Sequence, residues 1–386
     1  DEGTNTGGQS TWTLKNLTPG EVIFIRVTAT NAGGESLPGP TLAVGVAQAG
    51  QRANLLLVGG FDRFDTGLNL LLDYTRFTQV HRLFLDRMND GMLLATYGRA
   101  LRAKGIAFDA AWRDAVGTGI DLKAYRAILW AAAKGATEVA GLTDDDIEAL
   151  ANAAQAGVSL LISGSTVAKS LAASTSPAAT ALLGEHLAAA LGTEGQTHTS
   201  LVPAETSGVL HGLGTLPLGD TAWRPFPVGP VDTIAATAQG EVTASYGAGG
   251  GALVESRPGH ACSLLATFPL AALGDDDRRA EAIAKVATHC PIDGGGTAID
   301  GGPHPHVDAG PTDASSGDIP PSPGDASKGD GDGETGGGGG GCDCRVAGTH
   351  RRSGGKAGGD LPTAIILLGL FLVTRVRRRH RRPRRP

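Results

Sequence analysis

The sequence has little cysteine, no long apolar run and no basic excess over most of its length. Its 386 residues include four cysteines, and none of them has the spacing of a structural metal site. Twelve of the 33 Lys and Arg residues, but only two of the 39 Asp and Glu residues, lie in residues 342–386. That segment therefore has a net charge of +10, and the remaining 341 residues have −16. An acidic body disfavours nucleic acid as a partner, because phosphates must be neutralised by basic side chains.

The longest apolar run is Leu361–Thr374, fourteen uncharged residues near the C-terminus. A comfortable bilayer span needs about 20 residues, so this run predicts a short hydrophobic helix. It is followed by RVRRRHRRPRRP, with eight arginines in twelve residues. Basic flanks of this kind stay on the cytoplasmic side of a membrane. We therefore expect the membrane to be a partner of this tail, with the body of the chain outside.

A cysteine lies about twenty residues before the apolar run, where Gly341-Cys342 ends a stretch of six glycines. The order Gly-Cys, spacer, apolar run and arginine cluster resembles the MYXO-CTERM sorting tail of myxobacteria. The resemblance implies that Cys342 is the processing and anchoring site, with Cys344 as a poorer candidate. It also implies an extracytoplasmic chain at the cell surface or outer membrane. The alternative for residues 342–386 is a short transmembrane anchor that is never cut.

Residues 292–341 consist mainly of Gly, Asp, Pro and Ser. Such a segment cannot bury enough apolar area to offset the entropy of ordering it, so we expect a disordered linker. Its Asp-Gly repeats lack the closing Glu of a twelve-residue calcium loop. His304 and His306 have no further ligands nearby. We predict no metal site and no cofactor.

Residues 1–48 have the alternation of β-strands, over 10–17, 21–31 and 41–47. The phrase LTPGEVIFIRVTATNAGGESLPGP resembles the last three strands of a fibronectin type III domain, although Ile23 occupies the usual tyrosine position. The resemblance implies a partial β-sandwich, about half a domain. The apolar face of these strands then lacks its partner sheet.

Residues 53–291 are long enough to bury a sizeable core, and their apolar runs alternate with helical patterns. This alternation predicts an α/β domain with a parallel sheet. Thr143 is expected to cap a helix whose first turn is acidic. Strands are predicted over 53–60, 106–111, 125–132, 158–163, 252–255 and 261–267, and helices over 93–104, 143–156 and 277–289.

The order of these elements resembles the flavodoxin- and glutamine-amidotransferase-like α/β fold. The similarity is carried by NLLLVGGFDRFD, YGRALRAKGIAFD, SLLISGSTVAKSL and HACSLLATFPLAALGDDDRRAEAIAKV. It is greatest to the version joined to fibronectin modules in secreted bacterial proteins, some of them xanthan-lyase-like or amidase-like. The resemblance implies a flavodoxin/amidotransferase-like parallel sheet for this domain.

The residues that an amidotransferase needs are missing. Its nucleophile is a cysteine on a sharp strand-to-helix turn, and here that turn is Ser163-Gly164-Ser165-Thr166. The family's His and Glu follow a late strand, where this chain has Thr267-Phe268-Pro269-Leu270. Ser165 is not in a Gly-x-Ser-x-Gly elbow. We predict no catalytic residues; the free histidines that a hydrolase would need are His186, His198, His211 and His260.

Ligands of open α/β sheets bind beyond the carboxyl ends of the strands. Asp62 and Arg63 follow the first strand, and Ser163, Ser165 and Thr166 follow a later one. We predict these five as weak ligand-binding residues. For Asp62–Asp65 a structural turn with a local ion pair is the alternative.

Cys262 begins a late strand, and Cys290 ends the helix that runs back antiparallel to it. This topology brings the two thiols together, and outside the cytoplasm they are disulfide candidates.

These features together favour a surface-tethered, extracytoplasmic binding or scaffolding protein whose amidotransferase-like domain is noncatalytic. Cell-wall material, extracellular polysaccharide or surface proteins are the expected partners. One alternative is a hydrolase or lyase that degrades cell wall or exopolysaccharide, or an accessory part of one. Another is an inert spacer.

Overall fold

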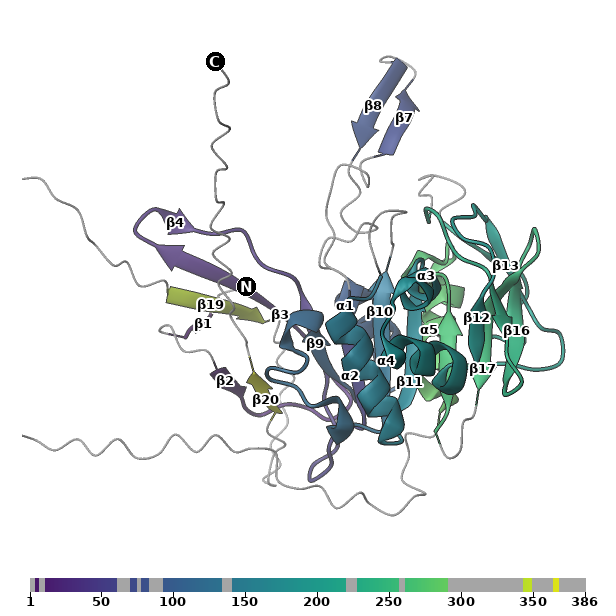
Figure 1. Cartoon of the computed structure of the whole chain (residues 1–386). Helices are drawn as coiled ribbons and strands as arrows, with labels where there is room; N and C mark the ends of the chain where they lie inside the picture. Colours follow the sequence, from purple (N-terminus) through teal and green to yellow (C-terminus); the bar gives the residue numbers. More distant parts are fainter. Residues whose placement is uncertain are drawn as a thin grey trace, which may run out of the picture.

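The computed structural model describes residues 4–6, 11–60, 70–74, 78–82, 93–133, 141–219, 228–256, 261–290, 343–348 and 364–367 (Figure 1). Its main feature is an 11-stranded sheet, which is parallel in one half and antiparallel in the other. A smaller sheet formed by the N-terminal residues lies beside the parallel half.

The parallel half confirms that the body is an α/β fold with a largely parallel sheet. Its adjacent strands all run the same way. The four apolar side chains of Leu55–Val58 are all fully buried, because helices cover both faces of the sheet. In spatial order the strands are β9 (Asp109–Trp112), β6 (Leu55–Gly59), β10 (Ala127–Ala133), β11 (Ser159–Gly164) and β18 (Ser263–Ala266).

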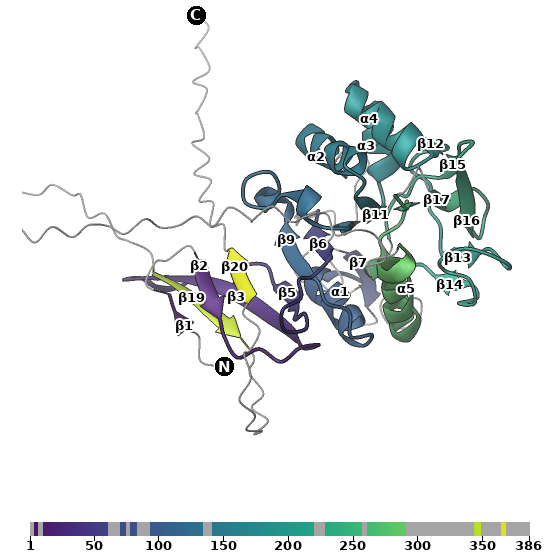
Figure 2. The same ribbon diagram turned by 90° about the horizontal axis from the view of Figure 1, so that it is seen from below.

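The helices form two layers on this sheet (Figure 2). Helices α1 (Leu93–Arg102) and α5 (Asp276–His289) pack together on one face. The other face is covered by α2 (Asp144–Gln155), α3 (Val167–Ala173) and α4 (Pro177–Ala181). Helix α2 begins as the sequence predicted: the Thr143 hydroxyl accepts from the Asp146 amide, and the Asp146 carboxylate accepts from the Thr143 amide.

The antiparallel half continues from β18 through strands of two to seven residues, most of which the sequence pattern missed. Strand β17 (Gly251–Ser256) pairs with β18, and β16 (Gly240–Tyr246) follows it. The other members are β13 (Ser200–Pro203), β14 (Leu216–Pro217), β15 (Ile234–Ala236) and β12 (Ala189–Leu191). The short helical turns of the body are Arg113–Ala115, Leu122–Ala124, Leu182–His186 and Leu270–Ala272.

The N-terminal sheet is built on β3 (Val22–Asn31), which pairs with β5 (Leu42–Gly45) and β4 (Gly34–Glu35). Its apolar face, which the sequence left without a partner sheet, packs on α1. Ala43 belongs to the same buried cluster as the apolar face of α1, and Phe24 packs against that cluster. Gly45 and Phe108 exchange two backbone hydrogen bonds, at 2.8 and 3.2 Å. The N-terminal strands therefore share a core with the α/β body.

Six further strands complete the description. Strands β1 (Thr4–Asn5) and β2 (Thr11–Leu14) precede β3, and β7 (Leu70–Tyr74) forms a hairpin with β8 (Thr78–Arg82). Strand β19 (Asp343–Gly348) pairs with β3, and β20 (Ala364–Leu367) pairs with β2.

Strand β20 corrects one prediction. A helix was expected over the C-terminal apolar run, and it is wrong for Ala364–Leu367, which form a strand. The segment AIIL contains two adjacent β-branched residues, which favour extended backbone. The rest of the run, the linker over 292–341 and Cys342 lie outside the described residues. Within the described ranges, no helix has the length and apolarity needed to cross a membrane.

Candidate functional site

The sequence predicted ligand contacts at the carboxyl end of β11. In the structure, another segment of the same chain covers this strand end. Ser163 is fully buried. Its hydroxyl donates to the Phe268 carbonyl at 2.9 Å and accepts from the Leu270 amide at 2.9 Å. The segment that follows β18 thus lies across the end of β11. The hydroxyl is used to hold this segment in place.

A buried tyrosine adds to this closure from α1. The Tyr97 side chain is hydrogen-bonded to Ser163 and to the backbone of Ala271. Burial raises the pKa of Tyr97 far above its usual value, and the two hydrogen bonds offset only part of that shift. The phenol therefore stays protonated at physiological pH and serves as a buried structural group.

Ser165 lies in the turn between β11 and α3 and is 1% exposed. Its hydroxyl has no hydrogen-bond partner within the described part of the chain. A hydrolase nucleophile sits on a sharp, strained elbow, whereas Ser165 has no positive φ. The residues other than glycine that do, among those described, are Asn16, Thr78 and Ala188. The backbone at Ser165 therefore lacks the left-handed conformation that would mark such a strained turn.

Thr166 is buried and precedes α3 as its N-cap residue. The structure thus brings Ser163, Ser165 and Thr166 together at one strand end. Asp62 and Arg63 lie outside the described residues. Ligand binding by these five residues remains a prediction.

A buried carboxylate that the sequence did not single out lies close to this turn. Asp232 is 1% exposed and accepts backbone N–H groups from Lys169 at 3.0 Å and Gly195 at 3.4 Å. Burial raises its pKa, and the two hydrogen bonds oppose that rise without cancelling it. Lys169 belongs to α3, so Asp232 fixes the start of that helix. No periodic pattern in the sequence marks this aspartate.

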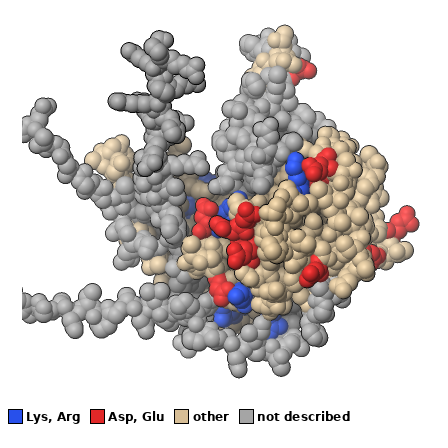
Figure 3. Space-filling view, viewed as in Figure 1, with Lys and Arg blue, Asp and Glu red and all other residues tan. Residues whose placement is uncertain are grey.

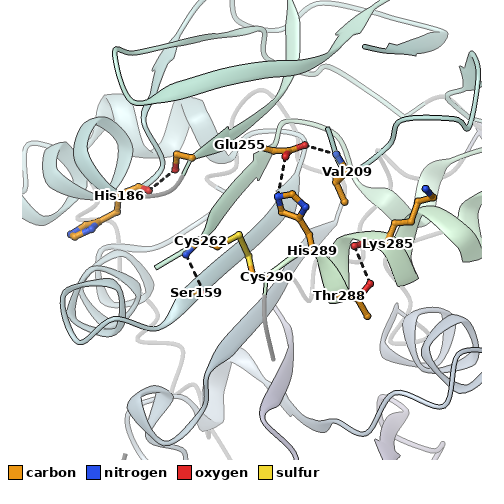
Figure 4. The surroundings of a disulfide bond; sticks show 10 residues. Ser159, His186, Val209, Glu255, Cys262, Lys285, Thr288, His289 and Cys290 are labelled. Carbon is orange, nitrogen blue, oxygen red and sulfur yellow. Dashed lines mark hydrogen bonds and ion pairs between the residues drawn. A yellow bond between two sulfur atoms is a disulfide. The ribbon is translucent and has the colours of Figure 1, made fainter. Parts of the chain in front are cut away.

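The second polar cluster surrounds Glu255 on β17 (Figure 4). One carboxylate oxygen accepts from the Val209 amide and the Thr243 hydroxyl, both at 2.6 Å. The other oxygen lies 2.9 Å from Nε2 of His289, the last residue of α5. Burial alone would raise the pKa of Glu255. The hydrogen bonds from His289, Thr243 and Val209 outweigh that effect, and the net pKa is lowered.

A disulfide lies beside this cluster. Cys262 and Cys290 are bonded in the structure, 28 residues apart in sequence with Cα atoms 5.5 Å apart. Figure 4 shows the bond between the start of β18 and the end of α5. The sequence identified the cysteine pair from topology. It gave no signal for Glu255 and His289, whose approach depends on the packing of α5 over β17.

Within the described structure, no contact is seen between a serine hydroxyl and the ring of a histidine that was considered as a base. The ring of His198 stacks on Tyr246, with centroids 4.1 Å apart. Burial lowers the pKa of His198, and within the described residues its ring nitrogens have no hydrogen-bond partner. His260 is outside the described residues. A serine–histidine pair is therefore not seen in the part of the chain that is described.

Other charged groups serve the fold. Arg113 donates to the Gly60 carbonyl at 3.3 Å and to the Thr143 hydroxyl at 3.0 Å, and it pairs with Asp146. These contacts join the end of β6 to the start of α2. Acidic side chains gather on the face shown in Figure 3. No three His, Cys, Asp or Glu residues among those described are grouped to hold a metal ion.

Comparison with known proteins assigns no family. No family model matches the chain, and no curated protein matches it. The solved structures that are similar to the chain include three with TM-scores below 0.5. An exo-β-1,4-mannosidase, Op5Man5 from Opitutaceae bacterium strain TAV5, has a TM-score of 0.39 at 11% identity, over 62% of this chain and 37% of its own.

The second is a putative GMP synthase subunit from Thermoplasma acidophilum, with a TM-score of 0.34 at 12% identity over 62% of this chain and 96% of its own. The third is a β-galactosidase from Marinomonas ef1, with a TM-score of 0.31 at 14% identity over 61% of this chain and 28% of its own. The chain thus spans about a third of the length of the two glycosidases. Similarities of this size assign no activity.

Proposed function

We propose that this chain is an extracytoplasmic, surface-tethered binding or scaffolding protein, and that its α/β body is a noncatalytic, amidotransferase-like domain. The observation that carries the proposal is the closed end of β11. Ser163 is engaged by Phe268 and Leu270, which belong to the segment where an amidotransferase would place its His and Glu. Here that segment bonds to the strand end and supplies no catalytic side chain.

The neighbouring hydroxyl supports the same conclusion. Ser165 is 1% exposed, on unstrained backbone and without a base among the described residues. Nucleophilic catalysis needs a hydroxyl within hydrogen-bond reach of a base. Among the residues of the body that the structure describes, neither a free cysteine thiol nor a paired serine and base is seen, which supports the noncatalytic assignment.

Activity assays of the full chain test the noncatalytic assignment. We expect no ammonia release from glutamine and no new reducing ends from cell-wall or exopolysaccharide preparations, both measured against buffer. Ser165→Ala is the matched variant. Ammonia release that disappears in Ser165→Ala would mean that the body is an amidotransferase. Release of reducing ends would favour the alternative, a polysaccharide-degrading enzyme.

The tethering half of the proposal is supported by the order of the tail and by the disulfide of the body. Disulfides persist in oxidising compartments, and the tail from Gly341-Cys342 to the arginine cluster has the pattern of a sorting signal. Intact mass of the mature protein from its native host tests this. We expect the chain to end at, or carry a modification on, Cys342. A mature product that still contains Arg385 would contradict processing at Cys342.

A further inference from the structure

The last turn of α5 is fastened to the sheet at two adjacent residues. Cys290 is bonded to Cys262 at the start of β18, and His289 pairs with Glu255 on β17. The two strands are neighbours in register, since Ser256 lies opposite Ser263. Both fastenings are shielded: Cys262 and Cys290 are 5% and 0% exposed, and the side chains of His289 and Glu255 are 14% and 13% exposed.

The strand that receives the disulfide lies inside the large sheet. Strand β18 is hydrogen-bonded to β11 on one side and β17 on the other. At Cys262 itself, the backbone N–H donates to the Ser159 hydroxyl at 3.3 Å and the carbonyl accepts from the Leu160 amide at 3.2 Å. A pull on Cys290 is therefore passed through the sulfur atoms to an interior strand held on both edges.

Without the disulfide the same pull would act on the end of α5 alone. A helix pulled from its end detaches one turn at a time, so each contact opposes the force singly. A strand held between two neighbours opposes it with many hydrogen bonds together. Cys290 is the last residue of the α/β body that the structure describes, and Gly- and Pro-rich residues follow it in the sequence. A force transmitted along those residues would therefore reach the body at Cys290.

We propose that Cys262–Cys290 and Glu255–His289 form a force-resisting fastening, which keeps α5 on the sheet when the chain beyond residue 290 is pulled. Its biological meaning rests on the proposed tethering. The disulfide bears most of the force, and the ion pair is a second fastening that acts when the disulfide is absent. Opening the disulfide takes two electrons and two protons from a dithiol, which is itself oxidised to a disulfide.

The ion pair is set among few other charges. Glu241 lies directly across from Glu255 on β16, and its carboxylate accepts from the Ser207 hydroxyl. Lys285, one turn before His289 on α5, donates to the His211 carbonyl at 3.2 Å. His289 is thus the side chain that contacts the second carboxylate oxygen of Glu255. Glu241 supplies a matched control, since it is a carboxylate on the neighbouring strand that holds no helix.

Force spectroscopy on the purified full chain, held at its two ends, tests the fastening. In the native chain we expect α5 to open only with the sheet. In Cys262→Ser/Cys290→Ser it should peel before the large sheet opens, at lower force. The 14 residues of α5 and Cys290 extend to roughly 50 Å, of which the helix already spans about 20 Å, so the expected gain is about 30 Å. Adding Glu255→Gln should lower the force again, whereas adding Glu241→Gln should not.

Hydrogen exchange of the amides of residues 285–290 without force gives a second readout. Loss of one charge-assisted hydrogen bond should speed exchange about tenfold when Glu255→Gln is added to the double cysteine variant. If that variant fails to fold, the native protein reduced after folding takes its place. An α5 that opens together with the sheet in the absence of the disulfide would overturn the proposal, as would equal effects of Glu255→Gln and Glu241→Gln. Both measurements use purified protein, so they stand or fall separately from the tethering, which the mass of the mature chain tests.

Discussion

The two halves of the large sheet are stabilised in different ways. In the parallel half, β6, β10 and β11 are buried along their length between two helix layers. In the antiparallel half, strands β12 to β15 have only two to four residues, and Val202 on β13 is 43% exposed. Buried apolar side chains such as Leu201 and Leu253 stabilise that half as well. It adds to them the hydrogen-bonded carboxylates Asp232 and Glu255 and a disulfide.

This difference has a physical origin in helix coverage. Parallel strands need crossover helices, and those helices bury both faces of the sheet. Short antiparallel strands need only turns, so one face can remain near solvent. Because strands of two to four residues each bury few side chains, a buried hydrogen bond or a covalent link adds to their stability.

The strongest test compares one apolar truncation in each half. Leu161→Ala removes a fully buried side chain from β11 and should lower the free energy of unfolding by about 2–5 kcal/mol. Val202→Ala, on partly exposed β13, should stay within about 0.5 kcal/mol. Urea denaturation measures both. Equal losses would mean that the two halves do not differ in how they are held.

Removal of the disulfide should have the next largest effect. The disulfide lies at β18, the strand where the two halves of the sheet meet. The link closes a loop of 28 residues, which in the chain-entropy model stabilises the fold by roughly 3–4 kcal/mol. Cys262→Ser and Cys290→Ser should each show this loss, and reductant should add nothing to either. Two reactive thiols in the unreduced, denatured body, cut before Cys342, would show that the bridge does not form.

The same contrast explains which elements the sequence predicted. Three of the parallel strands, β6, β10 and β11, are apolar runs of five to seven residues, and the strands over 53–60, 125–132 and 158–163 were predicted close to these observed positions. Strands such as β14 and β15 have two or three residues. Segments this short show no period of two, so no local pattern could predict them.

The candidate site was predictable only in part, for a related reason. The turn at Ser163–Thr166 follows a clear apolar strand, so its place at a carboxyl strand end was predictable. The bonds of Ser163 reach residues more than 100 positions away. Nothing local indicates that this hydroxyl is already engaged. The cysteine pair was identified because the order of strand and helix alone brings the two ends together.

A smaller effect should show whether the N-terminal sheet belongs to the parallel half. Gly98 on α1 faces β5, and a Cβ at Gly98 would lie 2.6 Å from that of Ala43. In a free helix Gly→Ala stabilises by about 1 kcal/mol. Here Gly98→Ala should destabilise by about 1–3 kcal/mol, because the close contact forces the sheet away.

The control for Gly98→Ala is the same change in an Ala43→Gly background, where the clashing Cβ is gone. There the substitution should be neutral or stabilising in thermal denaturation. A stabilising Gly98→Ala in the native background would mean that β5 does not rest on α1, and that the N-terminal sheet is separate from the body.

The smallest expected effect is a pH dependence of stability, which should have opposite signs for the two carboxylates of the antiparallel half, Glu255 and Asp232. The pKa of Glu255 is lowered in the fold by its hydrogen bonds, which outweigh burial. Its ionised form is thus favoured by folding. The stability that it contributes is fully present above its unfolded pKa, near 4.5, and is lost as the pH falls through the lower folded value. Asp232 has the opposite sign, because burial raises its pKa above the usual 3.8.

The neutral form of Asp232 is therefore the one favoured by folding, and its contribution is lost as the pH rises from 3.8 through the raised value. Urea denaturation between about pH 3 and pH 7 should separate the two groups. The stability of the native chain relative to Glu255→Gln should shrink toward low pH, whereas its stability relative to Asp232→Asn should grow. If both differences change in the same direction with pH, the hydrogen bonds to Glu255 do not outweigh its burial. The polar cluster beside the disulfide would then cost the fold stability at neutral pH.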